Sequence, residues 1–288
     1  MTRAGLAQRF GVEAQGLAAF RALADGEYER SLSTLIEGEI IPRLMIAHAT
    51  DVPARAAPST PAPIDFADVE ALAPLALQVE ADALLAHIEA ILARGISVDS
   101  VMVDLLAPAA RLLGEYWEDD RCDFVDVTMG LWRLQEVVHE IAARAPAERM
   151  LAAGGHRALF ASMPGDQHNF GTVVIDELFR RDGWITDRLS GVETPDLLRR
   201  VGSDWFDMIG LTVSCDCHIG ALPALLAAVR NVSRNPRVCI MVGGRIFRDD
   251  PTLAARIGAD GTAPDARMAL TVAADLVRVR EGEMIVCN

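Results

Sequence analysis

The chain has 288 residues, enough for about two domains, and half of its residues are apolar. Its formal net charge of −14 argues against a surface that binds duplex nucleic acid, because such a surface needs concentrated basic side chains. All 27 basic residues are arginine, which excludes the lysine-dependent chemistry of Schiff-base enzymes and P-loop NTPases. The first ten residues lack the apolar core of a signal peptide, and no apolar run approaches the ~20 residues that span a bilayer. We therefore expect a cytoplasmic protein.

The N-terminal half shows helical patterns without strands. Apolar residues at helical spacing predict a helical arm over residues 1–50, and four prolines within residues 51–64 predict a linker. Residues 65–148 predict a bundle of four or five helices, in which Ser97 or Asp99 caps one helix and a last helix covers about 125–144.

Strand and helix patterns alternate over residues 154–283. Thr194 is expected as a helix N-cap with Pro195 in the first turn. Further helices are expected over 172–181 and 221–229, near 251–257, and up to about 278. This alternation predicts a flavodoxin/Rossmann-like, doubly wound, parallel five-stranded sheet. The expected strands are 156–163, 184–189, 208–213, 238–242 and 258–263.

Three loops leave the carboxyl ends of predicted strands, where open parallel sheets bind their ligands. The first loop carries Asp166 and His168, spaced so that the carboxylate can accept one ring N–H and fix the tautomer. The second ring nitrogen is then free to coordinate a metal. The other two loops begin at Thr212 and at Gly243.

The motif Asp166-x-His168-x-x-Gly171, followed by Ser214 and by Gly243-Gly244, resembles the cobalamin-binding domain of the base-off, His-on type. The resemblance implies that His168 is the lower axial cobalt ligand and that the nucleotide tail of the vitamin runs past the hydroxyl loop and the glycine pair. Two departures are that Ser214 lies one residue further from Gly171 than usual and that Asp216 stands where a leucine is usual. The cofactor-binding residues that the resemblance implies here are Asp166, Gln167, His168, Asn169, Phe170, Gly171, Thr212, Ser214, Gly243 and Gly244.

The bundle is expected to cap the upper corrin face. Adenosylcobalamin light sensors of the CarH type carry a Trp followed ten residues later by Glu-His, whereas Trp117 is followed here by Val127-Thr128. An adenosyl upper ligand is therefore not expected. Trp132, Glu136 and His139 share one helix face, which either packs within the bundle or brings Trp132 and His139 toward the cofactor.

Three segments resemble the antirepressors of photosystem gene expression of the AerR/PpaA type. They are Glu37–Arg43, Leu131–His139 and Pro164–His168. The resemblance implies a non-enzymatic, light-linked regulator that binds aquo- or hydroxocobalamin and acts on a DNA-binding repressor of photosystem genes. Haem in the same domain is a rival cofactor. A corrinoid methyl carrier of a methyltransferase system is the rival function, although the loop after His168 lacks the Ile-Gly-Lys ending typical of such carriers.

The five cysteines are too few and too scattered for a disulfide framework. Cys215 and Cys217 are expected at the mouth of the crevice as buried spectator thiols, with a redox role as the alternative and a structural zinc site not expected.

Overall fold

The computed structural model of the chain describes residues 63–144 and 155–286, all within one unit that comprises residues 61–288. The predicted arm, most of the predicted linker and the last residues of the predicted bundle segment lie outside the described residues. Within the described part of the chain, no helix is both long and apolar enough to cross a membrane.

The first part of the described chain is all-helical. Ser97, rather than Asp99, is the N-cap of the helix that begins at Val98, because its side chain accepts a hydrogen bond from the Ser100 amide at 3.1 Å. The helix that follows continues through a π-helical stretch, η2, with no break. The elements are α3 (Phe66–Gln78), α4 (Ala81–Ala93), α5 (Val98–Ser100), η2 (Val101–Leu106), α6 (Ala107–Glu118) and α7 (Phe124–Arg144).

The second part is a five-stranded, all-parallel sheet in the order β2-β1-β3-β4-β5, which confirms the flavodoxin-like prediction. The last strand is shorter than predicted because Gly258 and Ala259 close the end of α12 (Thr252–Arg256), with their amides donating to the Ala255 and Ala254 carbonyls at 3.1 and 3.0 Å. Pairing with β4 therefore begins at Gly261. The strands are β1 (Arg157–Ser162), β2 (Ile185–Leu189), β3 (Met208–Thr212), β4 (Cys239–Gly243) and β5 (Gly261–Thr262).

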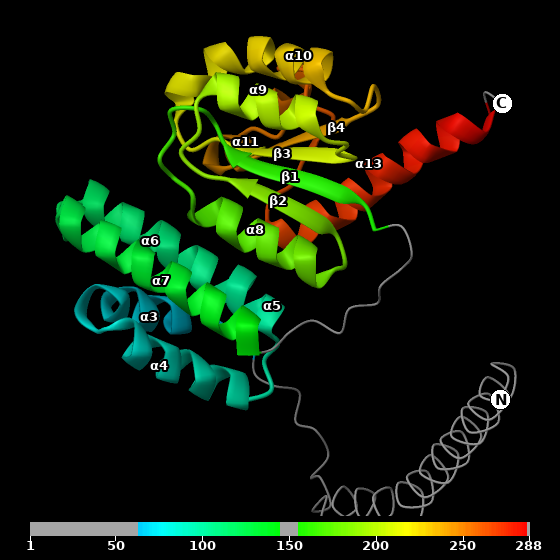
Figure 1. Ribbon diagram of the computed structural model, residues 1–288. Helices are drawn as coiled ribbons and strands as arrows, with labels where there is room; N and C mark the ends of the chain where they lie inside the picture. The colour runs from blue at the N-terminus through cyan, green and yellow to red at the C-terminus, as the bar shows by residue number, and fades with distance from the viewer. Residues whose placement is uncertain (1–62, 145–154, 287–288) are drawn as a thin grey trace, which may run out of the picture. The chain divides into compact units, whose positions relative to one another are not determined.

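Helices cover both faces of the sheet (Figure 1). One face packs on α8 (Phe170–Arg181) and α13 (Ala266–Val286) through a core that includes Phe160 and Phe179. The other face packs on α9 (Thr194–Ser203), α10 (Leu222–Val232), α11 (Arg245–Asp249) and α12 (Thr252–Arg256).

Several helix limits differ from the prediction. Helix α8 begins at Phe170, two residues early, and α13 continues eight residues beyond 278. Thr194 is not the N-cap of α9: Glu193 occupies that position without a side-chain hydrogen bond, and Thr194 is the first helical residue. Pro195 does lie in the first turn, as predicted.

Helix α8 joins the helical region to the sheet. Its residues Phe170, Val173 and Leu178 are buried in the same apolar core as the bundle helices. The Phe179 ring faces the other way, 4.9 Å from the Phe160 ring of β1. The loop that precedes α8 is therefore attached to both parts of the unit.

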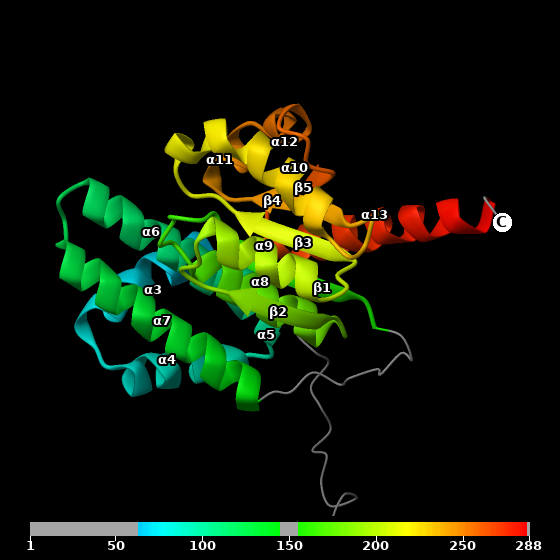
Figure 2. The same ribbon diagram turned by 45° about the horizontal axis from the view of Figure 1, so that its top comes forward.

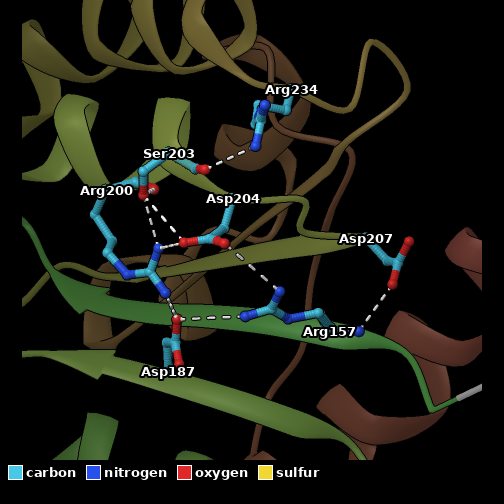
Figure 3. A network of polar contacts seen from close by, with 7 residues as sticks. All are labelled: Arg157, Asp187, Arg200, Ser203, Asp204, Asp207 and Arg234. Carbon is cyan, nitrogen blue, oxygen red and sulfur yellow. Dashed lines mark hydrogen bonds and ion pairs between the residues drawn. The ribbon is translucent and has the colours of Figure 1, made fainter.

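A network of arginines and aspartates fastens α9 to the sheet (Figure 3). Arg200 pairs with Asp187 of β2 and with Asp204, while Arg157 of β1 lies within 4.0 Å of the same two carboxylates. The Arg157 amide donates to Asp207 at 2.8 Å. This network lies toward the amino ends of β1 and β3, opposite the loops described next.

Candidate cofactor site

The candidate site lies where β1, β3 and β4 end, beside the point at which the strand order reverses between β1 and β3. Ser162, Thr212 and Gly243 are aligned across these three strands in the last register position of each. The loop after β1 is tied to β3 because the Met163 amide donates to the Thr212 carbonyl at 2.8 Å. The loops that the sequence predicted to converge therefore start from one row of residues.

Asp166 is the buried anchor of the first loop, and its side chain is only 2% exposed. One carboxylate oxygen accepts the His168 amide at 3.0 Å and His168 Nδ1 at 2.7 Å. The other oxygen accepts the Ser214 amide from the loop after β3, at 2.8 Å. One carboxylate thus fixes the loop conformation, the imidazole orientation and the distance between two loops.

The charge of Asp166 is stabilised in spite of its burial. Burial raises the pKa of this carboxyl, but hydrogen bonds from the His168 side chain and amide and from the Ser214 amide outweigh it and lower the pKa to about 2. The hydrogen bond to Asp166 in turn raises the pKa of His168, against the opposing effect of burial. Nδ1 therefore carries the proton that Asp166 accepts, and Nε2 is left as a basic ligand atom.

The His168 side chain is 69% exposed although its partner is buried. Its main-chain carbonyl is fixed as well, because the buried Ser162 hydroxyl donates to it at 2.9 Å. Gln167 is exposed next to it, whereas Phe170 turns into the core shared with the bundle. Of the predicted loop residues, Phe170 is therefore packed in the core at the start of α8.

Two glycines at the strand ends have open space where a side chain would stand. A Cβ on Gly243 would have no atom within 4 Å, and one on Gly171 would meet only the Thr212 methyl group, at 3.9 Å. The Thr212 hydroxyl is buried between them with no hydrogen-bond partner among the described residues. An orphaned buried hydroxyl beside open space is the expected feature of a site that a polar ligand completes.

Gly244 shapes the same edge through its backbone. It has φ +123°, and a Cβ there would lie 2.0 Å from the Val213 carbonyl oxygen. Only glycine permits this approach of the loop after β4 to the loop after β3. The glycine pair thus has two functions: Gly243 leaves space and Gly244 brings two loops together.

The helical region contributes one direct contact to the loop. Gln135 of α7 donates to the Asn169 side chain at 2.8 Å. Trp132, one turn earlier on α7, is 49% exposed, and Trp117 of α6 is 48% exposed. In both views the turn between α6 and α7 lies on the side where the strands end (Figures 1 and 2).

His139 is exposed and lies within electrostatic range of Glu177 on α8, two turns along α7 from Trp132. The His139 side chain therefore lies near the contact between α7 and α8. At the positions that would carry Glu-His, Val127 is buried in the bundle core and the Thr128 hydroxyl donates to the Phe124 carbonyl at 2.7 Å.

Sequence reasoning missed Ser162, Gln135 and the state of the two cysteines. Ser162 lies near the end of a predicted strand and Gln135 shares the helix face of Trp132, so both positions could be predicted from the sequence. Cys215 and Cys217 are exposed and bonded to each other, so the prediction of buried spectator thiols is wrong. Cys215 caps the 3-10 helix η3 (Asp216–Ala221), which keeps both sulfur atoms at the surface of the loop.

Residues 156–271 match the family model of the B12 binding domain. This B12-binding segment spans the whole parallel sheet and all three loops of the candidate site. The match supports a cobalamin-binding protein.

The chain is similar to one protein in sequence and to two solved structures. An uncharacterized 20.5 kDa protein from the bchF-crtJ intergenic region of Rhodobacter capsulatus is 26% identical over 176 residues, which cover 61% of this chain and 91% of that protein. The Methanosarcina barkeri monomethylamine corrinoid protein has a TM-score of 0.59 at 14% identity, covering 75% of this chain and 100% of that one. A cobalamin-binding protein of Desulfitobacterium hafniense is 15% identical with a TM-score of 0.38, over 73% and 98% of the two chains.

The residues of the site fit a cobalamin. The corrin ring supplies four nitrogens to cobalt, so the protein needs to add one axial nitrogen, and the exposed Nε2 of His168 is suited to that role. The open space at Gly171 and Gly243 and the unpartnered Thr212 hydroxyl would face the displaced nucleotide tail. In a bound cobalamin, His168 would supply the axial nitrogen, and the residues at the strand ends would hold the part of the vitamin that it displaces.

Proposed function

We propose that this protein is a non-enzymatic, cobalamin-binding regulator that acts in the cytoplasm on a DNA-binding repressor of photosystem genes. The regulatory part rests on the relative encoded between bchF and crtJ, in a photosynthesis gene region. The alignment with this chain covers about nine-tenths of that relative. The Asp166–His168 pair carries the cobalamin part.

The proposed ligand is aquo- or hydroxocobalamin. Alkyl cobalamins lose their upper alkyl group in light, so a protein that selects the form without it responds to illumination. Val127 and Thr128 are engaged in bundle packing and in a backbone hydrogen bond, and neither offers a side chain to a large upper ligand.

The loop is connected to the helical region. Asn169 contacts Gln135 of α7, and α8 begins at Phe170 within the bundle core. Ligand binding at His168 therefore bears directly on α7 and α8. A regulator requires such a connection, because a ligand shifts only an equilibrium between states that it binds with different affinity.

Cobalamin binding is tested with purified protein and hydroxocobalamin. After gel filtration, the wild-type protein should keep a stoichiometric pigment with shifted visible bands, and His168→Ala should lose the shift. His87→Ala on α4 is the matched control and should behave as the wild type. A protein that elutes colourless, or that takes up haem with a Soret band and no cobalamin, contradicts the proposal.

The regulatory step is tested on a promoter fragment of a photosystem gene bound by the repressor from the same genome. Protein loaded with hydroxocobalamin should release the repressor from the fragment, and the apoprotein or the His168→Ala variant should not. Equal release by all three, or by none, contradicts the regulator.

A methyl carrier is the second candidate, favoured by the overall fold likeness to the monomethylamine corrinoid protein across its whole length. It predicts methyl transfer from protein-bound methylcobalamin to a thiol when a partner methyltransferase is present. The regulator predicts no transfer above the rate of free methylcobalamin.

A further inference from the structure

The bonded cysteines directly follow Ser214, which contacts the hydrogen-bond partner of His168. Ser214, whose amide donates to Asp166, is the residue before Cys215. On the other side of the pair, His218 lies next to the loop after β1: a Cβ added to Gly165 would be 3.8 Å from its ring. The cysteine segment therefore lies close to the ligand loop on both flanks.

The segment is short and highly constrained. Cys215 and Cys217 have a Cα–Cα distance of 5.2 Å, and the Cys217 amide also donates to the Cys215 sulfur at 3.2 Å. The His218 amide donates to the Cys215 carbonyl at 3.1 Å, which closes the first turn of η3. The sulfur–sulfur bond is thus one of three links that close a turn starting one residue from the Asp166 contact.

Stabilisation of the fold does not account for this bond. A disulfide stabilises a fold mainly by restricting the conformations of the unfolded chain, and the effect grows with the length of the loop that it closes. A bridge between residues two apart closes a very short loop. Both cysteines are exposed, so reductants and oxidants in solution can reach them. Of the other cysteines, Cys122 is half-buried and Cys239 is buried, and they are not bonded to each other.

We propose that Cys215 and Cys217 form a reversible dithiol–disulfide pair whose bonded state holds the Ser214 amide on Asp166 and thereby keeps His168 oriented. Oxidation joins the two sulfur atoms and removes two protons and two electrons, which a low-molecular-weight disulfide such as oxidised glutathione accepts as it becomes two thiols. A dithiol reductant reverses the step. The inference concerns the site of the proposed function, but the redox pair itself requires no cofactor.

The first test uses the full-length apoprotein. Trypsin releases residues 201–230 as one peptide that contains both cysteines and no other. After equilibration in glutathione buffers of increasing oxidation, this peptide should convert reversibly from a form that takes up two thiol-blocking groups to one that takes up none. If the peptide takes up two blocking groups in every buffer, or none in every buffer, the proposal is overturned.

The second test measures the contact itself, again without cobalamin. The Ser214 amide should exchange its hydrogen about tenfold more slowly in the oxidised protein than in the reduced protein, because the hydrogen bond to Asp166 protects it. Cys215→Ser/Cys217→Ser should match the reduced protein under both conditions, and Cys122→Ser should behave as the wild type. Equal exchange in both redox states refutes the coupling even if the pair is redox-active.

The third test asks whether the contact matters for the cofactor. With excess thiol removed, the oxidised protein should bind hydroxocobalamin about tenfold more tightly than the double serine variant, as expected when the orientation of a metal-bound histidine is loosened. The serine variant contains no thiol at this position that could itself coordinate cobalt. Equal affinities overturn the link to His168, whereas absence of binding in every variant contradicts the proposed function and leaves the first two tests standing.

Discussion

Replacing Asp166 by asparagine removes one charge and almost no volume, so it tests the hydrogen-bond arrangement of the candidate site directly. Asp166 accepts three N–H groups, two on one oxygen and one on the other. Asparagine has only one oxygen. If that oxygen remains with His168, the new NH₂ group faces the Ser214 amide, donor against donor; if the amide flips, the conflict moves to His168.

The magnitude follows from these contacts. A hydrogen bond to a charged group contributes about 1.5–3 kcal/mol, and a buried donor left without a partner costs about 1–3 kcal/mol. Removing a buried charge recovers part of this loss, because burial by itself disfavours the carboxylate. We expect Asp166→Asn to lower the free energy of unfolding of the apoprotein by about 2–3 kcal/mol, which is about 5–10 °C in Tm for a unit of this size.

Three measurements check the prediction. Thermal unfolding gives the loss of stability, with the exposed Asp182→Asn as a control that should unfold within about 1 °C of the wild type. NMR titration should show the pKa of His168 falling toward its ordinary value, since the hydrogen bond to Asp166 raises it in the wild type. Hydroxocobalamin affinity should fall about 10–100-fold. A variant with wild-type Tm and an unchanged His168 pKa would refute the argument that this carboxylate holds the loop.

Other predictions follow from single residues. Gly243→Val should leave Tm within about 1 °C and abolish cobalamin binding, because its side chain enters the open space at the strand ends. Retained binding in a gel-filtration assay would contradict this role of the open space. Gly244→Ala should instead destabilise the apoprotein by about 2–4 kcal/mol, measured by denaturant unfolding, through strain at φ +123° and the clash with the Val213 carbonyl. Burial raises the pKa of Glu177, so its carboxylate destabilises the fold above the unfolded-state pKa of about 4.3. Glu177→Gln should therefore raise Tm at pH 7.5, with the gain shrinking as the pH falls toward 4; a gain independent of pH would contradict the assignment. Gln135→Ala should cost about 1 kcal/mol in urea unfolding, and no measurable loss would mean that the contact with Asn169 is not maintained in solution.

The fold could be predicted because its signals are local. Alternating strand and helix patterns, a proline in a first turn and a serine before a helix each constrain only their own neighbourhood. The limits that were wrong depend on distant partners. Helix α8 begins early because Phe170 is buried against the bundle, and strand β5 pairs with β4 only from Gly261.

The candidate site divides in the same way. Asp166 and His168 are two residues apart, so their hydrogen bond could be inferred from spacing alone. Asp166 also accepts the Ser214 amide, which is 48 residues away in the sequence, and the Gln135–Asn169 contact spans 34 residues. Both contacts require the assembled fold. The exposure of Cys215 could not be inferred because it depends on where η3 lies relative to the sheet.

The arrangement of loops suggests why a signal at His168 reaches other parts of the molecule. Asp166 and its neighbours connect three separate elements: the loop after β3 through Ser214, α7 through Asn169 and Gln135, and the shared core through Phe170. A small rotation of the loop cannot preserve all of these contacts, because hydrogen bonds and close-packed cores tolerate only small displacements. Ligation at Nε2 would therefore favour one arrangement of the loops and of the bundle together, and the same contacts would link the site to the bond between Cys215 and Cys217.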